Sequence, residues 1–323
     1  MRVFIAGASG AIGTRLVPRL VERGHHVVGT YHTPGKDEVL RALGAEPVAL
    51  DLVDHEAVLA AVRAASPDAI VHEATALANQ TFSRNFDRTF AATNRLRTEG
   101  TDALLAAAWD VGVRRIVAQS FASYRYAREG GPVKTEDDPL DPDPPASMRE
   151  GFAALHHLEE SVASVDGIVL RYGGFYGDPD DGMLEPVRKG RFPIVGDGGG
   201  MTSFVHLEDA AAATVLALER GAPGIYNICD DEPAPAREWL PYMARTLGAK
   251  PPRRVPAFVA RILAGGAAVL IATEARAASN AKARRELGWE LRYPTWRQGF
   301  PAVYGSPARD VPPVGLGHPH PSS

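Results

Sequence analysis

Three glycines near the start of the chain, Gly7, Gly10 and Gly13, constrain its fold more than any other feature. They follow the apolar run 3–6 and precede segment 14–24, whose apolar residues have helical spacing. Further apolar residues come next, so the pattern predicts a β-α-β unit. In such a unit the first glycine permits a tight turn, and the second lets a diphosphate approach the backbone. The third glycine lets the helix pack closely against the strand.

The start of a helix in this position is an anion-binding site, because its backbone amides are free and its dipole is positive there. A glycine-rich turn without a ligand is the alternative interpretation. The location directly after the first strand and directly before a helix favours the ligand. The predicted dinucleotide-binding residues of this turn are Gly7, Ser9, Gly10, Ala11, Ile12 and Gly13.

Strand-like and helix-like segments then alternate along the chain. Helical patterns occupy 56–65 and 98–111, and short apolar runs predict strands at 47–50, 69–72, 115–119, 167–170 and 224–228. This rhythm is typical of an α/β fold with a doubly wound parallel sheet, the Rossmann architecture. A chain of 323 residues also has room for a second, smaller lobe.

Composition excludes several functions. The net charge is −4 and basic residues are scattered, so no nucleic-acid partner is expected. The single cysteine, Cys229, rules out an intramolecular disulfide and fits a reducing, cytoplasmic location. Met1 leads straight into a strand pattern, so no signal peptide is expected. The apolar run 262–272 is too short to span a bilayer; it predicts a buried helix and no membrane partner.

Histidine pairs in the sequence do not have metal-ligand spacing. His25-His26 and His156-His157 are adjacent residues, which do not share one helix face. No metal site is predicted. A Ser-His-Asp hydrolase is not expected either, since no G-x-S-x-G turn occurs.

Several stretches occur in the order typical of one family: GASGAIG, VRRIVAQS, LRYGGFYG, SFVHLEDAAAA, YNICDDEP and AKARRELGW. With them, the chain from Met1 to about Phe300 resembles the extended short-chain dehydrogenases, the NAD-dependent epimerase/dehydratase group. The resemblance implies that Asp51 and Leu52, after the third strand, hold the adenine, and Ala74 joins the cofactor set. It also implies that Arg171, Tyr176 and His206 line the substrate cleft, although a strand-end salt bridge and a buried hydrogen bond are their structural alternatives.

The resemblance implies two lobes. Residues 1–171 and 203–229 would form the dinucleotide-binding domain, and 172–202 with 230–303 the substrate lobe. The tail 304–323 is rich in Pro, Gly and His and is expected to be disordered. The proline-rich segment 130–147 covers the cleft or forms a plain surface loop. The sequence leaves open whether the chain forms a homodimer.

The second strand is expected to end near Tyr31, where an NAD enzyme usually carries an acid for the ribose 2′-hydroxyl. This chain has no acid there, and His32 and Lys36 follow. Those side chains could bond a 2′-phosphate, or could be ordinary loop polarity. The sequence therefore favours NADP over NAD as cofactor without excluding NAD.

The family's catalytic Tyr-x-x-x-Lys is missing. Alignment of the helix after the proline-rich segment puts either Gly151 and Leu155, or Phe152 and His156, at those positions. The serine region reads QSFASYRYAR. We expect Ser120 or Ser123 to polarise the substrate oxygen and Tyr124 to donate the proton, with Arg128 or His156 as the nearby cation. In the alternative interpretation, all these residues are structural.

Two functions remain open. The first is an NAD(P)-dependent oxidoreductase or epimerase/dehydratase-like enzyme with an altered catalytic set. It would act on a small hydroxyl or carbonyl substrate, such as a sugar nucleotide. The second is a non-catalytic dinucleotide-binding sensor or interaction protein.

Overall fold

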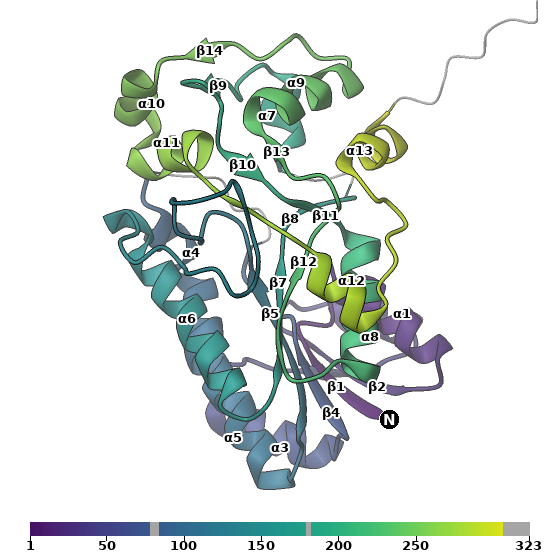
Figure 1. The fold of residues 1–323 in the computed structure, drawn as a ribbon. Coiled ribbons are helices and arrows are strands. Elements are labelled where there is room, and N and C mark those ends of the chain that lie inside the picture. The colour runs from purple at the N-terminus through teal and green to yellow at the C-terminus, as the bar shows by residue number, and fades with distance from the viewer. Residues whose placement is uncertain (78–83, 179–181, 306–323) are drawn as a thin grey trace, which may run out of the picture.

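A parallel sheet of seven strands forms the centre of the computed structural model, which describes residues 1–77, 84–178 and 182–305 (Figure 1). The strand order is β12-β7-β5-β4-β1-β2-β3. This order confirms the predicted doubly wound α/β fold. The strands are β1 (Arg2–Ala6), β2 (His26–Tyr31), β3 (Glu46–Ala49), β4 (Ala69–His72), β5 (Arg115–Phe121), β7 (Ile168–Tyr172) and β12 (Gly224–Ile228).

Helices cover both faces of the sheet because successive strand residues point to opposite sides. In β1, Val3 and Ile5 pack into one core, whereas Phe4 and Ala6 pack into the other. The first core is closed by α1 (Gly13–Glu22), α8 (Leu207–Arg220) and α12 (Ala281–Leu287). The second is closed by α3 (His55–Ala65), α5 (Thr101–Val111) and α6 (Arg149–Ala163). Helices α2 (Lys36–Ala42) and α4 (Phe86–Arg95) complete this domain.

One predicted helix begins later than expected. The pattern over 98–111 predicted a single helix, but α5 begins at Thr101. Residues Leu96–Gly100 form a π-helical turn, η1, that joins α4 to α5. A π turn inserts one extra residue into a helix and carries no simple sequence signature, so the hydrophobic spacing did not reveal it.

The chain reverses its winding between β1 and β4, and the loops after these strands meet there. Gly7 follows β1 with φ +85°, and its amide donates to Thr30 Oγ1 (3.0 Å). A Cβ on Gly7 would lie 2.6 Å from the Ala74 Cα, in the loop after β4. Ligands of doubly wound sheets bind outside the carboxyl ends of the strands at such a point.

A third hydrophobic core lies beyond the carboxyl ends of the strands, in the upper part of Figure 1. It includes Tyr176, Phe204, Trp239, Trp296 and Phe300. Its helices are α7 (Leu184–Arg188), α9 (Ala236–Thr246) and α13 (Trp296–Tyr304). Its short strands pair as β8 (Gly174–Tyr176) with β11 (Phe204–His206), β9 (Ile194–Val195) with β14 (Arg254–Val255), and β10 (Met201–Thr202) with β13 (Ala234–Pro235).

The proline-rich segment 130–147 is anchored to other elements. It contains β6 (Val133–Lys134), which pairs with β15 (Ala277–Ala278), and the 3₁₀ turn η2 (Ala146–Met148). Glu136 Oε1 accepts a hydrogen bond from the Asn227 amide in β12 (2.7 Å). The segment is thus held at the carboxyl edge of the sheet.

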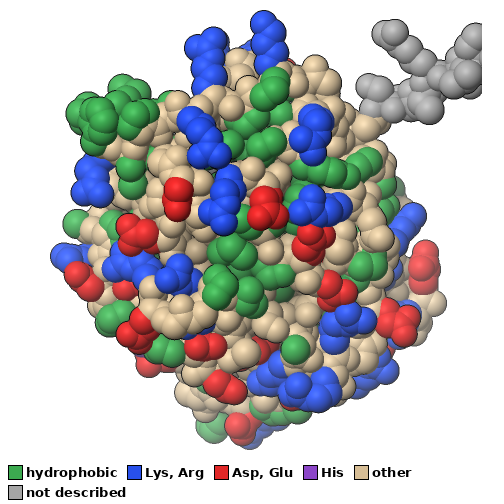
Figure 2. Space-filling model, turned by 45° about the horizontal axis from the view of Figure 1, so that its top comes forward, with side chains coloured by type: hydrophobic (Ala, Val, Ile, Leu, Met, Phe, Trp, Pro, Cys, Tyr) green, Lys and Arg blue, Asp and Glu red, His purple; other side chains and the backbone are tan. Residues whose placement is uncertain are grey.

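The prediction of one buried helix over 262–272 is wrong. Gly265, with φ +89°, separates α10 (Ala257–Ala264) from α11 (Gly266–Thr273). Ala267, Val269 and Leu270 of α11 are buried, but Ile262 and Leu263 of α10 are each 67% exposed. Figure 2 shows hydrophobic side chains gathered at the upper left, on the side where Figure 1 places α10. Of the helices in the described ranges, none is long and apolar enough to cross a membrane.

Two expectations remain untested. The predicted disordered tail lies almost entirely outside the described residues, which end at 305. The homodimer stays a prediction, because the structure describes a single chain.

A buried carboxyl group lies at the end of β4. Glu73 Oε1 accepts a hydrogen bond from the Tyr172 phenol (3.0 Å), and the Gln119 amide nitrogen, oriented toward it, donates to Oε2 (3.0 Å). Burial raises the pKa of Glu73 to about 8, and the Tyr172 hydrogen bond offsets this only in part. Glu73 is therefore largely protonated near neutral pH.

We expect Glu73→Gln to remove one component of the pH dependence of stability. The pKa is about 8 in the folded protein and near 4.5 in the unfolded chain. Wild-type stability therefore falls as pH rises from about 4.5 to 8 and then levels. The variant keeps a neutral side chain, so its stability relative to wild type should rise across that window. Urea denaturation at several pH values measures this, with exposed Glu150→Gln as control; a constant difference would contradict the assignment.

Candidate functional site

The three N-terminal glycines have three different geometries. A Cβ on Gly13 would collide with the Ala8 backbone, so this position must be glycine for α1 to approach β1. Gly10 is exposed, and a Cβ there would meet only the Gly7 carbonyl oxygen, at 3.3 Å. The backbone amides of residues 11–13 donate to no other described residue. With the positive φ of Gly7, this turn fits a dinucleotide diphosphate.

The remaining predicted cofactor residues flank this turn. Ser9 and Ala74 are half-buried beside it, and Asp51 is exposed directly after β3. Asp51 Oδ1 accepts a hydrogen bond from the Val53 amide (3.1 Å), which leaves its second oxygen for a ligand. Leu52 is buried in the core beneath it. Their adenine contacts remain a prediction.

The second strand ends at Tyr31, as expected. His32 and Lys36 follow on the surface, and neither forms an ion pair within the described ranges. Arg41, by contrast, is held by Asp37 (2.6 Å). Both side chains are exposed directly after β2, and their contact with a 2′-phosphate, like the preference for NADP, stays a prediction.

A buried ion-pair cluster occupies the ends of β5 and β7. Glu159 of α6 binds Arg125 (2.5 Å) through Oε1 and Arg171 (2.6 Å) through Oε2. The Ser120 hydroxyl also donates to Glu159 Oε1 (2.5 Å). Burial alone would raise the pKa of Glu159, but the two guanidinium groups outweigh it and lower the pKa to about 2. Arg171 is thus the strand-end salt bridge, which corrects its predicted role as a cleft residue, and Ser120 is committed to the same cluster.

Tyr176 and His206 are likewise buried rather than lining a cleft. Their rings pack edge to face, 5.1 Å apart. His206 Nδ1 accepts a hydrogen bond from the Glu208 amide (3.0 Å) and caps α8. Burial lowers the pKa of His206 to about 4, so the imidazole is neutral. The hydrogen bond supports the structural alternative for His206. The Tyr176 hydroxyl is buried and has no hydrogen-bond partner among the described residues, so the role of Tyr176 stays a prediction.

Ser123, which is buried, and Tyr124, which is half-buried, follow in the serine region. Tyr124 has φ +49°, a conformation that bulky side chains rarely adopt outside functional or strained sites. Its ring packs against Phe121 (5.1 Å) and Phe152 (6.5 Å). Burial raises the pKa of Tyr124 to about 12, so its phenol is protonated at neutral pH. Ser123 Oγ is buried and has no hydrogen-bond partner in the part that the structure describes.

Neither His156 nor Arg128, the two predicted cations, lies beside Ser123 and Tyr124. The His156 side chain is 60% exposed on the outer face of α6 and bonds Glu160 (3.1 Å). Arg128 contacts Asp141 (3.4 Å) and Glu274 (3.8 Å). The expectation that His156 or Arg128 serves as the nearby cation is therefore wrong. His156 points outward from α6, and Arg128 is paired with Asp141 and Glu274.

Arg97, on η1, was not predicted as a site residue. Burial lowers its pKa to about 10, and its charge interacts with Tyr124 and Glu159. Arg97 follows Asn94 by three residues, a spacing that puts both on one helix face. That spacing was the only available sequence signal.

The family's catalytic tyrosine and lysine are absent from α6. A Cβ on Gly151 would lie 3.6 Å from Asp87 Oδ1 and 3.8 Å from Asn94 Oδ1, which is ordinary van der Waals contact. Leu155, one turn later, is buried. Helix α6 therefore supplies neither phenol nor ammonium at the two positions of the family motif.

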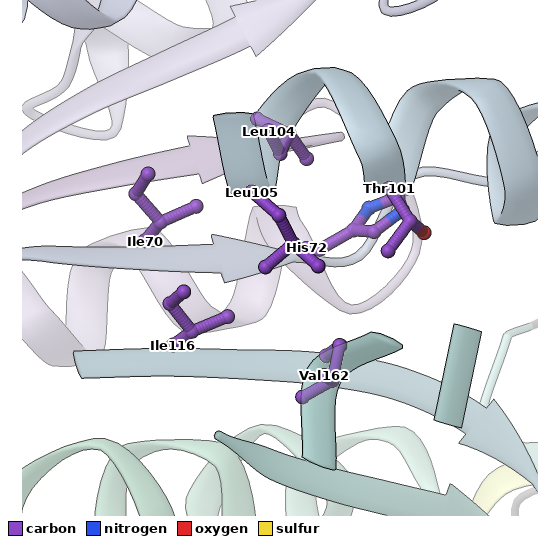
Figure 3. A pocket seen from close by; sticks show the side chains of 8 residues that line it. Ile70, His72, Thr101, Leu104, Leu105, Ile116 and Val162 are labelled. Atoms are coloured by element: carbon purple, nitrogen blue, oxygen red, sulfur yellow. The ribbon is translucent and has the colours of Figure 1, made fainter. Parts of the chain in front are cut away.

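A separate small cavity lies between the sheet and helices α5 and α6 (Figure 3). Its lining is apolar apart from His72 and Thr101. Burial lowers the pKa of His72 to about 4, and its Nε2 lies 3.3 Å from the Leu96 carbonyl oxygen. We assign this cavity to core packing. Among the described residues, no three His, Cys, Asp or Glu side chains cluster as metal ligands do.

We expect Gly10→Val to abolish dinucleotide binding without unfolding the protein. The added side chain fills the space above the turn, where a diphosphate would approach, and meets little protein. Calorimetric titration with NADPH and NADH measures the loss. Gly266→Val, which also enters open space but in α11, is the control for general glycine replacement. Retained affinity in Gly10→Val would contradict the assignment of the turn.

Comparisons with known proteins agree with this geometry. Residues 3–229 match the model of the NAD dependent epimerase/dehydratase family. The chain is 45% identical over 309 residues to a 3-diazoavenalumate denitrifying reductase from a Streptomyces species, covering 93% of this chain and 99% of the relative. It is 30% identical to a 4-hydroxy-2-methyl-3-oxo-4-farnesyl-3,4-dihydroquinoline-1-oxide ketoreductase from Stigmatella aurantiaca, covering 98% of each.

Among solved structures, the chain resembles the UDP-glucose 4-epimerase of Thermus thermophilus in complex with NAD. The TM-score is 0.72 at 26% identity, over 94% of this chain and 98% of that one. The reductase names of the relatives support an enzyme rather than a non-catalytic binding protein. The chain belongs to the NAD-dependent epimerase/dehydratase family and is an NAD(P)-dependent enzyme of the extended short-chain dehydrogenase type.

Proposed function

We propose that the protein is an NAD(P)H-dependent reductase that replaces the diazo group of an aromatic carboxylate by hydrogen and releases dinitrogen. The Streptomyces relative carries this chemistry in its name and matches nearly the full length of both chains. Similarity alone does not establish a substrate, so the proposal depends on what the site can and cannot do.

The observation that carries the proposal is the absence of the family's tyrosine and lysine from α6, whether their positions are Gly151 and Leu155 or Phe152 and His156. Reduction of a ketone adds a hydride and a proton, so it needs a proton donor beside the substrate oxygen. Replacement of a diazonium group by hydrogen balances as ArN₂⁺ + H⁻ → ArH + N₂, with no net proton. An enzyme for this reaction can therefore lack the tyrosine and lysine of the family motif and still be active.

The residues that would hold the cofactor are those of the glycine turn and the adjoining strand ends. Amides of residues 11–13 would bind the diphosphate, and Asp51 would accept a bond from the adenine amino group. His32 and Lys36 would bond a 2′-phosphate, which favours NADPH. The bound nicotinamide supplies the hydride.

Aromatic side chains beside the site suit a flat substrate. Tyr124 lies between Phe121 and Phe152, and it joins a hydrophobic cluster with Phe86 and Phe90. Residues Ala267 and Ile271 of α11 complete this cluster from the second lobe. An aromatic substrate would stack favourably on these side chains, and their close packing would exclude water.

Ketone reduction is the second candidate, and one observation favours it. Ser123 has a buried hydroxyl without a described partner, and Tyr124 follows it with a protonated phenol. Together they could polarise and protonate a carbonyl oxygen. This arrangement retains the predicted roles of Ser123 and Tyr124, and the Stigmatella relative is named a ketoreductase.

The direct test supplies the purified protein with NADPH and 4-carboxybenzenediazonium. Nicotinamide absorbance, dinitrogen release and benzoate formation are measured together. We expect all three in equal amounts, and no turnover with UDP-glucose. Gly10→Val at the same concentration is the control for direct reaction between the diazonium salt and NADPH. A wild-type rate no higher than that of this control would reject the proposal.

Tyr124→Phe separates the two candidate reactions. If the protein reduces diazonium groups, kcat/KM should be unchanged, because the reaction consumes no net proton. If it reduces ketones, loss of the general acid should lower kcat about 10²–10⁴-fold. Steady-state kinetics with 4-carboxybenzenediazonium and with an aryl ketone measure this. A large loss on the diazonium substrate, with NADPH affinity retained, would show that Tyr124 has a chemical role in that reaction.

Tyr31→Asp should shift cofactor preference toward NADH. A carboxylate at the end of β2 accepts a bond from the ribose 2′-hydroxyl and repels a 2′-phosphate. The ratio of the two dissociation constants measures the shift. Asp51→Ala is the comparison, since it should weaken both cofactors alike by about tenfold or more. An unchanged ratio in Tyr31→Asp would place the ribose elsewhere.

A further inference from the structure

We propose that Arg97 and Asn94 form an anion subsite beside Tyr124, which binds the carboxylate of the substrate. The choice of a carboxylate rests on the proposed function. The subsite itself rests on the geometry of the junction between α4, η1 and α6.

The π turn η1 fixes where Arg97 lies. It packs against α6, and the Leu96 carbonyl oxygen lies 3.3 Å from His72 Nε2 at the end of β4. Arg97 is thereby held at the carboxyl edge of the sheet, half-buried, with its charge acting on Tyr124. Single π turns inside helices occur often at functional sites because they re-aim side chains.

Arg97 has no hydrogen-bond or ion-pair partner among the described residues. The carboxylate that interacts with it, Glu159, is already bonded to Arg125, Arg171 and Ser120. The Arg97 guanidinium group is only half-buried, and its nitrogens keep contact with solvent. Such a group is prepared for an anion supplied by a ligand.

Asn94 supplies an independent observation. Its side chain is only 8% exposed, and neither the amide nitrogen nor the oxygen has a partner in the described ranges. Both atoms lie within 4 Å of the Cβ that Gly151 lacks, so the glycine leaves room beside them. A buried amide without partners is costly unless a ligand satisfies it.

Nearby charges are compatible with an anion. Asp87 also adjoins Gly151, but its Oδ1 accepts the Gly151 amide (3.0 Å) at the positive start of α6, which offsets its charge. The positive charge of Arg125 also acts on Tyr124. A guanidinium binds both oxygens of a carboxylate, and the Asn94 amide can donate to one of them. The aromatic part of the ligand would then lie on Tyr124 and Phe152.

The test needs no turnover. The full chain, saturated with NADP⁺, is titrated calorimetrically with cinnamate and with neutral cinnamamide. We expect cinnamate to bind, and Arg97→Met to weaken it about tenfold or more while leaving cinnamamide unchanged. Arg97→Lys should retain part of the affinity. Arg95→Met is the matched control, because Arg95 is exposed and paired with Glu99 (2.8 Å).

The melting temperature of the ligand-free protein gives a second readout. Because Arg97 is half-buried and has no partner among the described residues, Arg97→Met should not lower the melting temperature. A drop, with equal losses for cinnamate and cinnamamide, would show a structural role and overturn the subsite. Weaker NADP⁺ binding with unchanged cinnamate affinity would also overturn it, and would assign Arg97 to the cofactor ribose. If no dinitrogen is released but cinnamate still depends on Arg97, the proposed function fails and the subsite stands.

Discussion

The buried carboxylate of Glu159 is the interaction on which the candidate site depends. It joins α6 to the end of β5 through Ser120, to the following loop through Arg125, and to β7 through Arg171. Removing one partner of such a cluster would leave a buried charge unpaired, which is strongly destabilising. The cluster therefore holds the loop that carries Tyr124 in its left-handed conformation. Because the Glu159 carboxylate is already paired with Arg125 and Arg171, it does not neutralise Arg97.

The cofactor half of the molecule was predictable because local rules decide it. Each glycine of the N-terminal turn has its own local reason. Gly7 has a positive φ, Gly13 lets α1 approach β1 closely, and Gly10 leaves the face of the turn open. The sheet order follows from the strand and helix rhythm together with the short connections of such folds. The second strand, predicted to end near Tyr31, ends at that residue.

The catalytic half could not be predicted in the same way, because it depends on side chains that meet across elements. His156 and Arg128 were plausible cations by sequence distance, but helix phase turns the first outward and other carboxylates engage the second. Arg171 looked like a cleft residue until its partner Glu159 was located on α6. Arg97 reaches the site through a π turn, which hydrophobic spacing does not register.

The polar groups on the two facing helices suggest how one reaction could replace another in this family. On α6, neither Gly151 and Leu155 nor the alternative pair Phe152 and His156 supplies a phenol and an ammonium. On α4, Asn94 presents an unpaired amide beside Gly151, and Arg97 follows on η1. A guanidinium cannot release a proton at neutral pH, so this exchange ends proton transfer from that region while it keeps positive charge. Such a site suits a substrate that must be held by an anionic group but needs no proton from the enzyme. If the proposed function is correct, the absent motif and the unpaired arginine are two consequences of one change in chemistry.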